Sequence, residues 1–174
     1  DLLLIHRPDP MINAEETGSA LDRLVESGKV NAIGVSNFRP WDIDLLQSRM
    51  SNKLVTNQIE ISLGENSALT NGDLAYLQQH RVAPMAWSPL GGGSLFREPH
   101  SELSLKLNQM AEALSVDAAS LAIAWLLKHP ANILPIMGSN NIQRIEGFSK
   151  ALEIELDRQS WFELYQAANG TVVA

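Results

Sequence analysis

A short apolar run, N-A-I-G-V-S-N-F, at residues 31–38 limits the possible folds more than any other segment. Apolar and polar residues do not alternate in this run, which is typical of a parallel strand buried on both faces. The run ends on two polar residues, Ser36 and Asn37. Since parallel α/β proteins carry their functional residues at the carboxyl ends of the strands, we expect these two side chains at a functional edge.

Four other segments repeat this design, because each is apolar and stops on a polar, aromatic or glycine residue. They are L-L-L-I-H ending at His6, L-V-T-N-Q-I-E around Gln58, A-P-M-A-W-S at Trp87 and Ser88, and I-L-P-I-M-G-S-N at 138–140. Helical patterns separate the five runs, and this alternation predicts a parallel sheet. No linker or low-complexity stretch interrupts it, so we expect a single domain over residues 1–174.

The helix signals between the strands are equally regular. Asn13, with Glu16 three residues later, resembles a capping box for a helix that Gly28 ends. Pro40 suits the first position of the next helix, and residues 63–70 read as a polar loop. Further helices are expected over 71–80, between Arg97 and Val116, after Asp117, from about Asn141, and over 157–169.

Composition excludes several classes of protein. An apolar fraction of 45% and a charged fraction of 19% are ordinary for a globular protein, so wholesale disorder is excluded. The net charge of −7 disfavours nucleic acid as a partner. With no cysteine, the chain has no disulfide framework, thiolate metal site or cysteine nucleophile. Neither a signal peptide nor a transmembrane run is evident, so we expect a cytoplasmic protein without a membrane partner.

The expected architecture is a (β/α)8 TIM barrel of which this chain holds only about five of the eight units. A closed barrel takes about 250 residues, whereas this chain has 174 and predicts five strands. It also enters its first strand directly after Asp1. We therefore expect that the N-terminal units of the barrel are missing from this sequence.

Two strand ends favour phosphate binding. Gly91-Gly92-Gly93-Ser94 offers backbone amides that a phosphate can approach closely, because no Cβ intervenes. Gly138, Ser139 and Asn140 precede a short helix that carries Arg144 in its first turns. Alternatively, the glycines form a flexible loop and Arg144 is a solvated charge. The shared predicted face favours phosphate, and the lack of G-x-G-x-x-G after a strand excludes a Rossmann domain.

The other strand-end residues each allow two interpretations. Trp87 could stack on a planar ring or pack in a core. Ser36, Asn37 and Gln58 could bind an amide through paired donors and acceptors, or cap helices and turns. His6 could act as a general acid, orient a carbonyl, or be a hydrogen-bonded core histidine. No pair of histidines has the spacing of a metal site, so no metal is predicted.

Taken together, five motifs resemble the aldo-keto reductases in order, from residue 1 to about residue 168. They are H-R-P-D-P, G-K-V-N-A-I-G-V-S-N-F, N-Q-I-E-I-S, A-W-S-P-L-G-G-G and L-P-I-M-G-S-N-N-I-Q-R. The resemblance covers the fourth to eighth strands of that family's barrel. It is strongest to a branch of bacterial reductases that also resembles the voltage-gated potassium channel β-subunits.

The resemblance implies roles for particular residues. His6 resembles the histidine of the catalytic tetrad, which orients the substrate carbonyl. Ser36, Asn37 and Gln58 resemble the clamp for the nicotinamide carboxamide, and Trp87 resembles the aromatic residue that stacks on the nicotinamide. Ser88, Leu90 and Gly91 resemble the pyrophosphate loop. Gly138, Ser139, Asn140 and Arg144 resemble the segment that holds the adenosine 2′-phosphate, which implies NADP(H), although some members have Lys in place of Gly138.

The family's proton donor is a Tyr tuned by a Lys and an Asp, all from earlier strands. The two tyrosines of this chain, Tyr76 and Tyr165, fall in predicted outer helices. The resemblance therefore implies an NADPH-dependent reductase of small aldehydes or ketones that is inactive without the missing N-terminal half. Two alternatives remain: an NADP-binding regulatory or interaction module without significant turnover, and a non-redox phosphate-binding barrel such as an isomerase.

Overall fold

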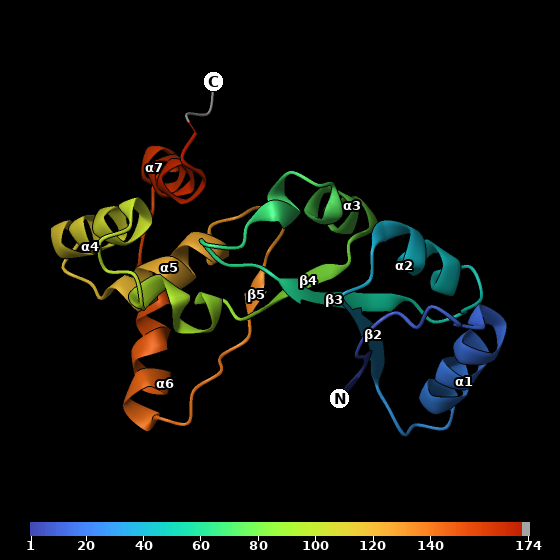
Figure 1. Ribbon diagram of the computed structural model, residues 1–174. Helices are drawn as coiled ribbons and strands as arrows, with labels where there is room; N and C mark the ends of the chain where they lie inside the picture. The colour runs from blue at the N-terminus through green and yellow to red at the C-terminus, as the bar shows by residue number, and fades with distance from the viewer. Residues whose placement is uncertain (172–174) are drawn as a thin grey trace. The chain divides into compact units, whose positions relative to one another are not determined.

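The computed structural model describes residues 1–171 (Figure 1). Its contacts divide the chain into two compact units. The first unit comprises Asp1–Ile59 and Ala68–Met85, and the second comprises Glu60–Ser67 and the chain from Ala86 onward.

Strands and helices alternate in the first unit, as the sequence predicts. The strands are β1 (Leu2–Ile5), β2 (Ala32–Ser36), β3 (Leu54–Glu60) and β4 (Ala83–Trp87), and they are hydrogen-bonded in that order. The β1–β2 and β2–β3 pairs are parallel. The last residues of β3 and β4 already belong to the second unit. The helices α1 (Ala14–Glu26), α2 (Pro40–Gln47) and α3 (Asp73–His80) each lie between successive strands.

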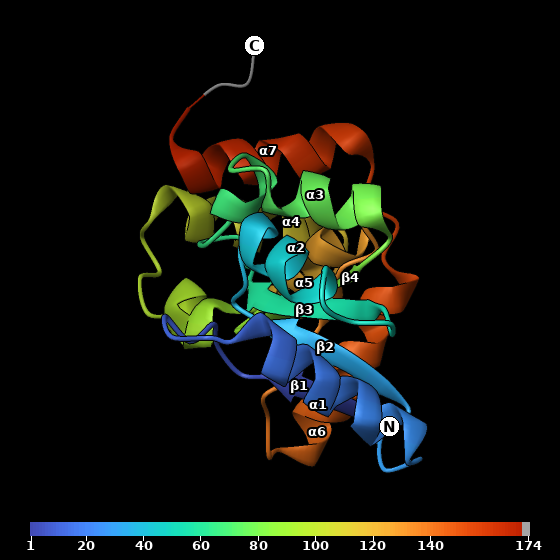
Figure 2. The ribbon, with the colours of Figure 1, turned by 90° about the vertical axis from the view of Figure 1, so that its right-hand side faces the viewer.

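The three helices form a row, in which α1 contacts α2 and α2 contacts α3. Figure 2 shows α1 and α2 on the same side of β1, β2 and β3. The predicted caps start these helices. The Asn13 side chain accepts hydrogen bonds from the amides of Glu15 and Glu16, at 3.1 and 3.2 Å, and Pro40 occupies the first position of α2.

Gly34 sets the register of the central strand. Ile33 pairs with Leu54, but Val35 pairs with Asn57, so β3 carries one extra residue, a bulge, opposite Gly34. A Cβ on Gly34 would lie 2.5 Å from Thr56 Cγ2 and 2.6 Å from Leu4 Cδ2. Only a residue without a side chain fits between these two neighbours, and the bulge then brings Ser36 opposite Gln58.

The edge strand β1 is less covered than β2. Leu2 and Leu3 are exposed, whereas Ile33, Val35 and Ser36 are buried. Within residues 1–171, β1 pairs with β2 alone. This agrees with the expected partial barrel, which leaves an open sheet edge.

The second unit consists mainly of helices. After β4 follow the 3₁₀ segment η2 (Gly91–Phe96), α4 (Glu102–Ala113) and α5 (Ala118–Leu127). Then come β5 (Leu134–Pro135), α6 (Ile142–Phe148), the 3₁₀ segment η3 (Ser149–Glu153) and α7 (Arg158–Asn169). The Asp117 and Asp157 carboxylates cap α5 and α7 by accepting from the amides of Ser120 and Ser160, at 2.8 and 2.7 Å. The predicted helices are therefore confirmed.

One sequence prediction was wrong in this unit. The last strand was expected to reach Gly138, but it ends at Pro135, because proline has no amide hydrogen to donate to the neighbouring strand. Just beyond the strand, the Ile136 amide donates to Ala86 O at 2.9 Å. The segment 63–70, expected to be a polar loop, forms no strand or α-helix and contains the 3₁₀ turn η1 (Ser67–Leu69). It also contains buried residues, including Leu63 and Asn66, and the Asn66 side-chain amide donates to Leu63 O at 2.9 Å.

A pair of tryptophans joins α5 to α7. The Trp125 and Trp161 rings are stacked 4.6 Å apart. Trp125 Nε1 donates to Trp161 O at 3.0 Å, and Trp161 Nε1 donates to Trp125 O at 2.9 Å. The latter bond satisfies a helix-end carbonyl, because the His129 amide, four residues on, donates to Leu126 instead.

Among the described residues, no single helix is long and apolar enough to cross a membrane. The pair α4 and α5 meets the length and composition criteria together, but the two helices are bent by 95° at the break between them.

Replacing Gly34 tests the register. We expect Gly34→Ala to lower the free energy of unfolding by about 1–3 kcal/mol or more, because its methyl group would overlap Thr56 and Leu4. The matched control is Gly147→Ala in α6, where an added Cβ meets nothing within 4 Å and helix propensity favours alanine by up to about 1 kcal/mol. Urea unfolding monitored by circular dichroism measures both. Equal stability of the two variants would show that Gly34 does not constrain the strand.

Replacing Trp161 tests the tryptophan pair. Trp161→Phe keeps an aromatic ring but leaves the carbonyl of buried Trp125 without its indole donor. We expect a loss of about 2 kcal/mol in the free energy of unfolding. The control is Trp41→Phe, since Trp41 is 69% exposed and its replacement changes little. A loss of similar size in both variants would contradict the proposed role of the bond.

Candidate functional site

Four of the predicted site residues lie together in the first unit. The register pairs Ser36 with Gln58 at the carboxyl ends of β2 and β3. The carbonyl of Gln58 accepts two hydrogen bonds, from Ser36 Oγ at 2.8 Å and from the Asn37 amide at 2.9 Å. The backbone of Gln58 therefore ties both neighbouring residues to the end of β3.

Asn37 connects this pair to His6. Its Nδ2 donates to Ser36 Oγ at 3.1 Å and to the carbonyl of His6 at 3.4 Å. Asn37 adopts a left-handed backbone conformation, with φ of 59°, which asparagine tolerates better than most residues. The His6 side chain is exposed, and that of Gln58 is half-buried. The four residues thus bring an imidazole, two carboxamides and a hydroxyl to the carboxyl ends of neighbouring strands.

Sequence analysis missed one residue of this arrangement, Asn57. It is 1% exposed, and its side chain binds the backbone of Phe38 on both sides, with Nδ2 donating to Phe38 O at 2.8 Å and Oδ1 accepting from Phe38 N at 3.4 Å. The signal in the sequence was a polar residue inside an otherwise apolar strand, immediately before Gln58.

The residues predicted for the pyrophosphate loop follow β4 in the second unit. Trp87, Ser88 and Leu90 are half-buried, and Ser88 has a left-handed conformation with φ of 47°. The Gly91 amide donates to Ser88 O at 2.7 Å, and the Gly93 amide donates to Leu90 O at 3.0 Å. Two of the amides expected to face a phosphate are therefore engaged within the loop itself.

The glycines of this loop are required by its conformation. Gly91, Gly92 and Gly93 all have positive φ, between 58° and 86°. An added Cβ at Gly92 or Gly93 would meet nothing within 4 Å, so open space lies above this part of the loop.

The last predicted group surrounds the start of α6. Asn141 caps the helix by accepting from the Arg144 amide at 3.0 Å, and its own amide donates to Ser139 Oγ at 3.1 Å. Gly138, Asn140 and Arg144 are exposed. Within residues 1–171, no ion pair involves the Arg144 guanidinium.

His6, Ser36, Asn37 and Gln58 lie in the first unit, and the residues from Trp87 to Arg144 lie in the second. That both groups of residues lie at the same end of the sheet therefore stays a prediction. Among the described residues, no cluster of three or more His, Asp or Glu side chains could hold a metal ion. A pocket of about 390 Å³ lies between the α4–α5 connection and η3, and no predicted site residue lines it.

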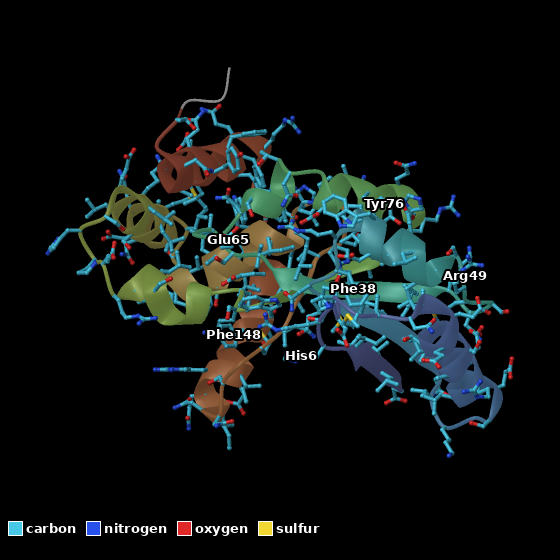
Figure 3. All side chains as sticks on the ribbon, turned by 45° about the vertical axis from the view of Figure 1, so that its right-hand side comes forward. His6, Phe38, Arg49, Glu65, Tyr76 and Phe148 are labelled. Atoms are coloured by element: carbon cyan, nitrogen blue, oxygen red, sulfur yellow. The ribbon has the colours of Figure 1, made fainter. Side chains whose placement is uncertain are left out.

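The two tyrosines belong to different units, Tyr76 to the first and Tyr165 to the second. The Tyr76 hydroxyl donates to the carboxylate of Asp44 on α2, and Figure 3 shows Tyr76 among the helices, well apart from His6. Burial, with the hydrogen bond and the negative charge of Asp44, raises the pKa of the Tyr76 phenol. Tyr165 lies on α7 and stacks on Trp161, with ring centroids 5.6 Å apart. Both are held by structural contacts.

Several known proteins are similar to this chain in sequence and in fold. The 6-dehydroglucose reductase of Agrobacterium fabrum is 63% identical over 174 residues, which are all of this chain and 59% of that protein. An aldo-keto reductase of Klebsiella pneumoniae, crystallised with NADPH, is 30% identical with a TM-score of 0.83, over 94% of this chain and 57% of that one. A thermostable aldo-keto reductase crystallised with epalrestat gives a TM-score of 0.88 at 29% identity, over 96% and 59%.

The chain spans about three fifths of the length of the curated relatives that it matches, with shares of 59% and 58% for two of them. The sequence profile of the Aldo/keto reductase family matches residues 1–169. The five strands and their helices correspond to part of the TIM barrel of these structural relatives. By profile, sequence identity and fold, the chain belongs to the aldo/keto reductase family.

Proposed function

We propose that this chain forms the cofactor-binding part of an NADPH-dependent reductase that converts an aldehyde or ketone into an alcohol. The observation that carries the proposal is the convergence of Ser36, Asn37 and Gln58 at the ends of β2 and β3. Carboxamide and hydroxyl groups together present both donors and acceptors, which suit the carboxamide of a nicotinamide ring. Two structural relatives crystallised with NADP or NADPH support the choice of cofactor.

The remaining cofactor contacts are assigned to the second unit. Trp87 offers an aromatic face to the nicotinamide, and the loop of Ser88, Leu90 and Gly91 faces the pyrophosphate. The open space above Gly92 and Gly93 leaves room for phosphate oxygens at that loop. Gly138, Ser139, Asn140 and Arg144 hold the 2′-phosphate, with the exposed guanidinium as the cation. When bound, NADPH supplies the reducing equivalent for the carbonyl carbon.

His6 is the residue of this chain that faces the substrate in the proposal. His6 follows β1 and is exposed, and its backbone carbonyl accepts a hydrogen bond from Asn37 Nδ2. In the proposal, the His6 imidazole donates a hydrogen bond to the carbonyl oxygen of the substrate and so orients it. Tyr76 and Tyr165 are engaged in structural contacts, so turnover requires a proton donor from outside these 174 residues.

Two relatives, 63% and 40% identical, are named 6-dehydroglucose reductases, which favours a sugar aldehyde as the substrate.

The second candidate is an NADP-binding regulatory or interaction module. It is favoured by the contacts of the two tyrosines, which leave the chain with binding residues but no placed proton donor. In this alternative the same residues hold the cofactor, and turnover plays no part.

Arg144 tests the choice of cofactor. We expect Arg144→Gln to weaken NADPH binding by about tenfold or more, because a charge-assisted bond to the 2′-phosphate is lost, and to leave NADH binding unchanged. Fluorescence titration of the reduced nicotinamide measures both. Arg49→Gln is the control, since Arg49 is an exposed cation whose nearest carboxylate lies 3.7 Å away. Equal weakening of NADPH and NADH would contradict the assignment, and no binding of either by the unmodified chain would favour a non-redox barrel.

Turnover separates the two candidate functions. We expect the 174-residue chain to leave 4-nitrobenzaldehyde and 6-dehydroglucose unreduced. Completed with the part of the Agrobacterium relative that lies outside the match, it should oxidise NADPH with either aldehyde. In the completed protein, His6→Ala should lower kcat about 100-fold with little change in NADPH affinity. Robust turnover by the chain alone would overturn the expectation of a missing donor, whereas cofactor binding without turnover in the completed protein would favour the regulatory module.

A further inference from the structure

Asn57 is a buried polar residue with no assigned role. We propose that it is a positioning residue that fixes Asn37, and through it the carboxamide clamp of Ser36, Asn37 and Gln58. This inference rests on the proposed function, because it concerns how tightly that clamp holds a nicotinamide.

The hydrogen bonds of Asn57 replace a missing part of the β-ladder. Strand β2 ends at Ser36, so Phe38 lies beyond the paired residues. The Asn57 side chain nevertheless satisfies both polar backbone groups of Phe38, at 2.8 Å to its carbonyl and 3.4 Å from its amide. Phe38 is 2% exposed, so water cannot take over these bonds.

These bonds hold Asn37 from both sides. The amide of Asn37 donates to Gln58 O at 2.9 Å, and the next residue, Phe38, is held by Asn57. A left-handed conformation such as φ of 59° at Asn37 persists where the surroundings over-determine it. Fixing the backbone there directs Nδ2 of Asn37 toward Ser36 Oγ and His6 O.

The side chain of Asn57 carries both the donor and the acceptor that the Phe38 backbone needs. A carboxylate lacks the donor for the Phe38 carbonyl, and serine or alanine is too short to meet both groups. The bulge opposite Gly34 pairs Asn57 with buried Val35 and pairs Gln58 with Ser36. One strand segment therefore supplies a clamp residue and, immediately before it, the residue that holds the clamp.

Replacing a residue that only stabilises the fold would weaken the binding of every ligand by the same factor. The discriminating pair of ligands is NADPH and 2′,5′-ADP, which carries the adenosine and the 2′-phosphate but no nicotinamide. We expect Asn57→Ala to weaken NADPH binding about tenfold and to change 2′,5′-ADP binding less than about twofold. Isothermal titration calorimetry of the 174-residue chain measures both.

Asn66→Ala is the matched control, because Asn66 is also buried and its side-chain amide donates to one backbone carbonyl. We expect it to leave the ratio of the two affinities unchanged. Should Asn57→Ala lose 2′,5′-ADP binding through misfolding, Asn57→Ser repeats the measurement with a side chain that keeps one hydrogen-bonding group.

A double-mutant cycle with Asn37→Ala tests whether Asn57 acts through Asn37. In the Asn37→Ala background, Asn57→Ala should weaken NADPH binding no further. Additive losses, or equal losses for both ligands, would overturn the positioning role. The proposed function fails separately if the unmodified chain binds 2′,5′-ADP and NADPH equally well, or binds neither.

Discussion

The contact between Gly34 and Thr56 is the constraint on which the candidate clamp depends. Because Gly34 has no side chain, Thr56 and Leu4 close in on it from the two neighbouring strands, and β3 accommodates the contact with a bulge. Without the extra residue, Ser36 would face Asn57 instead of Gln58. A slip of one residue reverses the direction of every side chain beyond it, so this packing contact decides which amide is buried and which reaches the functional edge.

The two units contribute different chemistry to the proposed function. The first holds its polar groups by backbone hydrogen bonds between adjacent strands, as in the bonds that Gln58 O receives from Ser36 and Asn37. The second presents a glycine loop and an exposed arginine, supported by the capped helices α5, α6 and α7. In the proposal, the first unit therefore binds the small planar carboxamide, and main-chain amides and the Arg144 guanidinium bind the phosphates.

Much of this organisation was predictable, for identifiable reasons. Asn13, Pro40, Asp117, Asn141 and Asp157 each begin a helix, because capping depends on a few adjacent residues. The end of β5 was predicted wrongly, since this strand stops at Pro135, and the burial of Leu63 and Asn66 in the loop was not predicted. Proline removes one donor from the ladder of β5, whereas burial in a loop depends on the residues that pack around it. Asn57 was missed because its partner, Phe38, lies nineteen residues earlier.

The order of strands and helices, the helix caps and the membership of the aldo/keto reductase family were predictable from the sequence, since they follow from local patterns and motifs. Four features became known from the folded chain alone: the bulge, the pairing of Ser36 with Gln58, the left-handed Asn37 and the hydrogen bond of Tyr76 to Asp44. The physical reason is that each of these depends on atoms from segments far apart in the chain, whose contact distances the sequence does not specify.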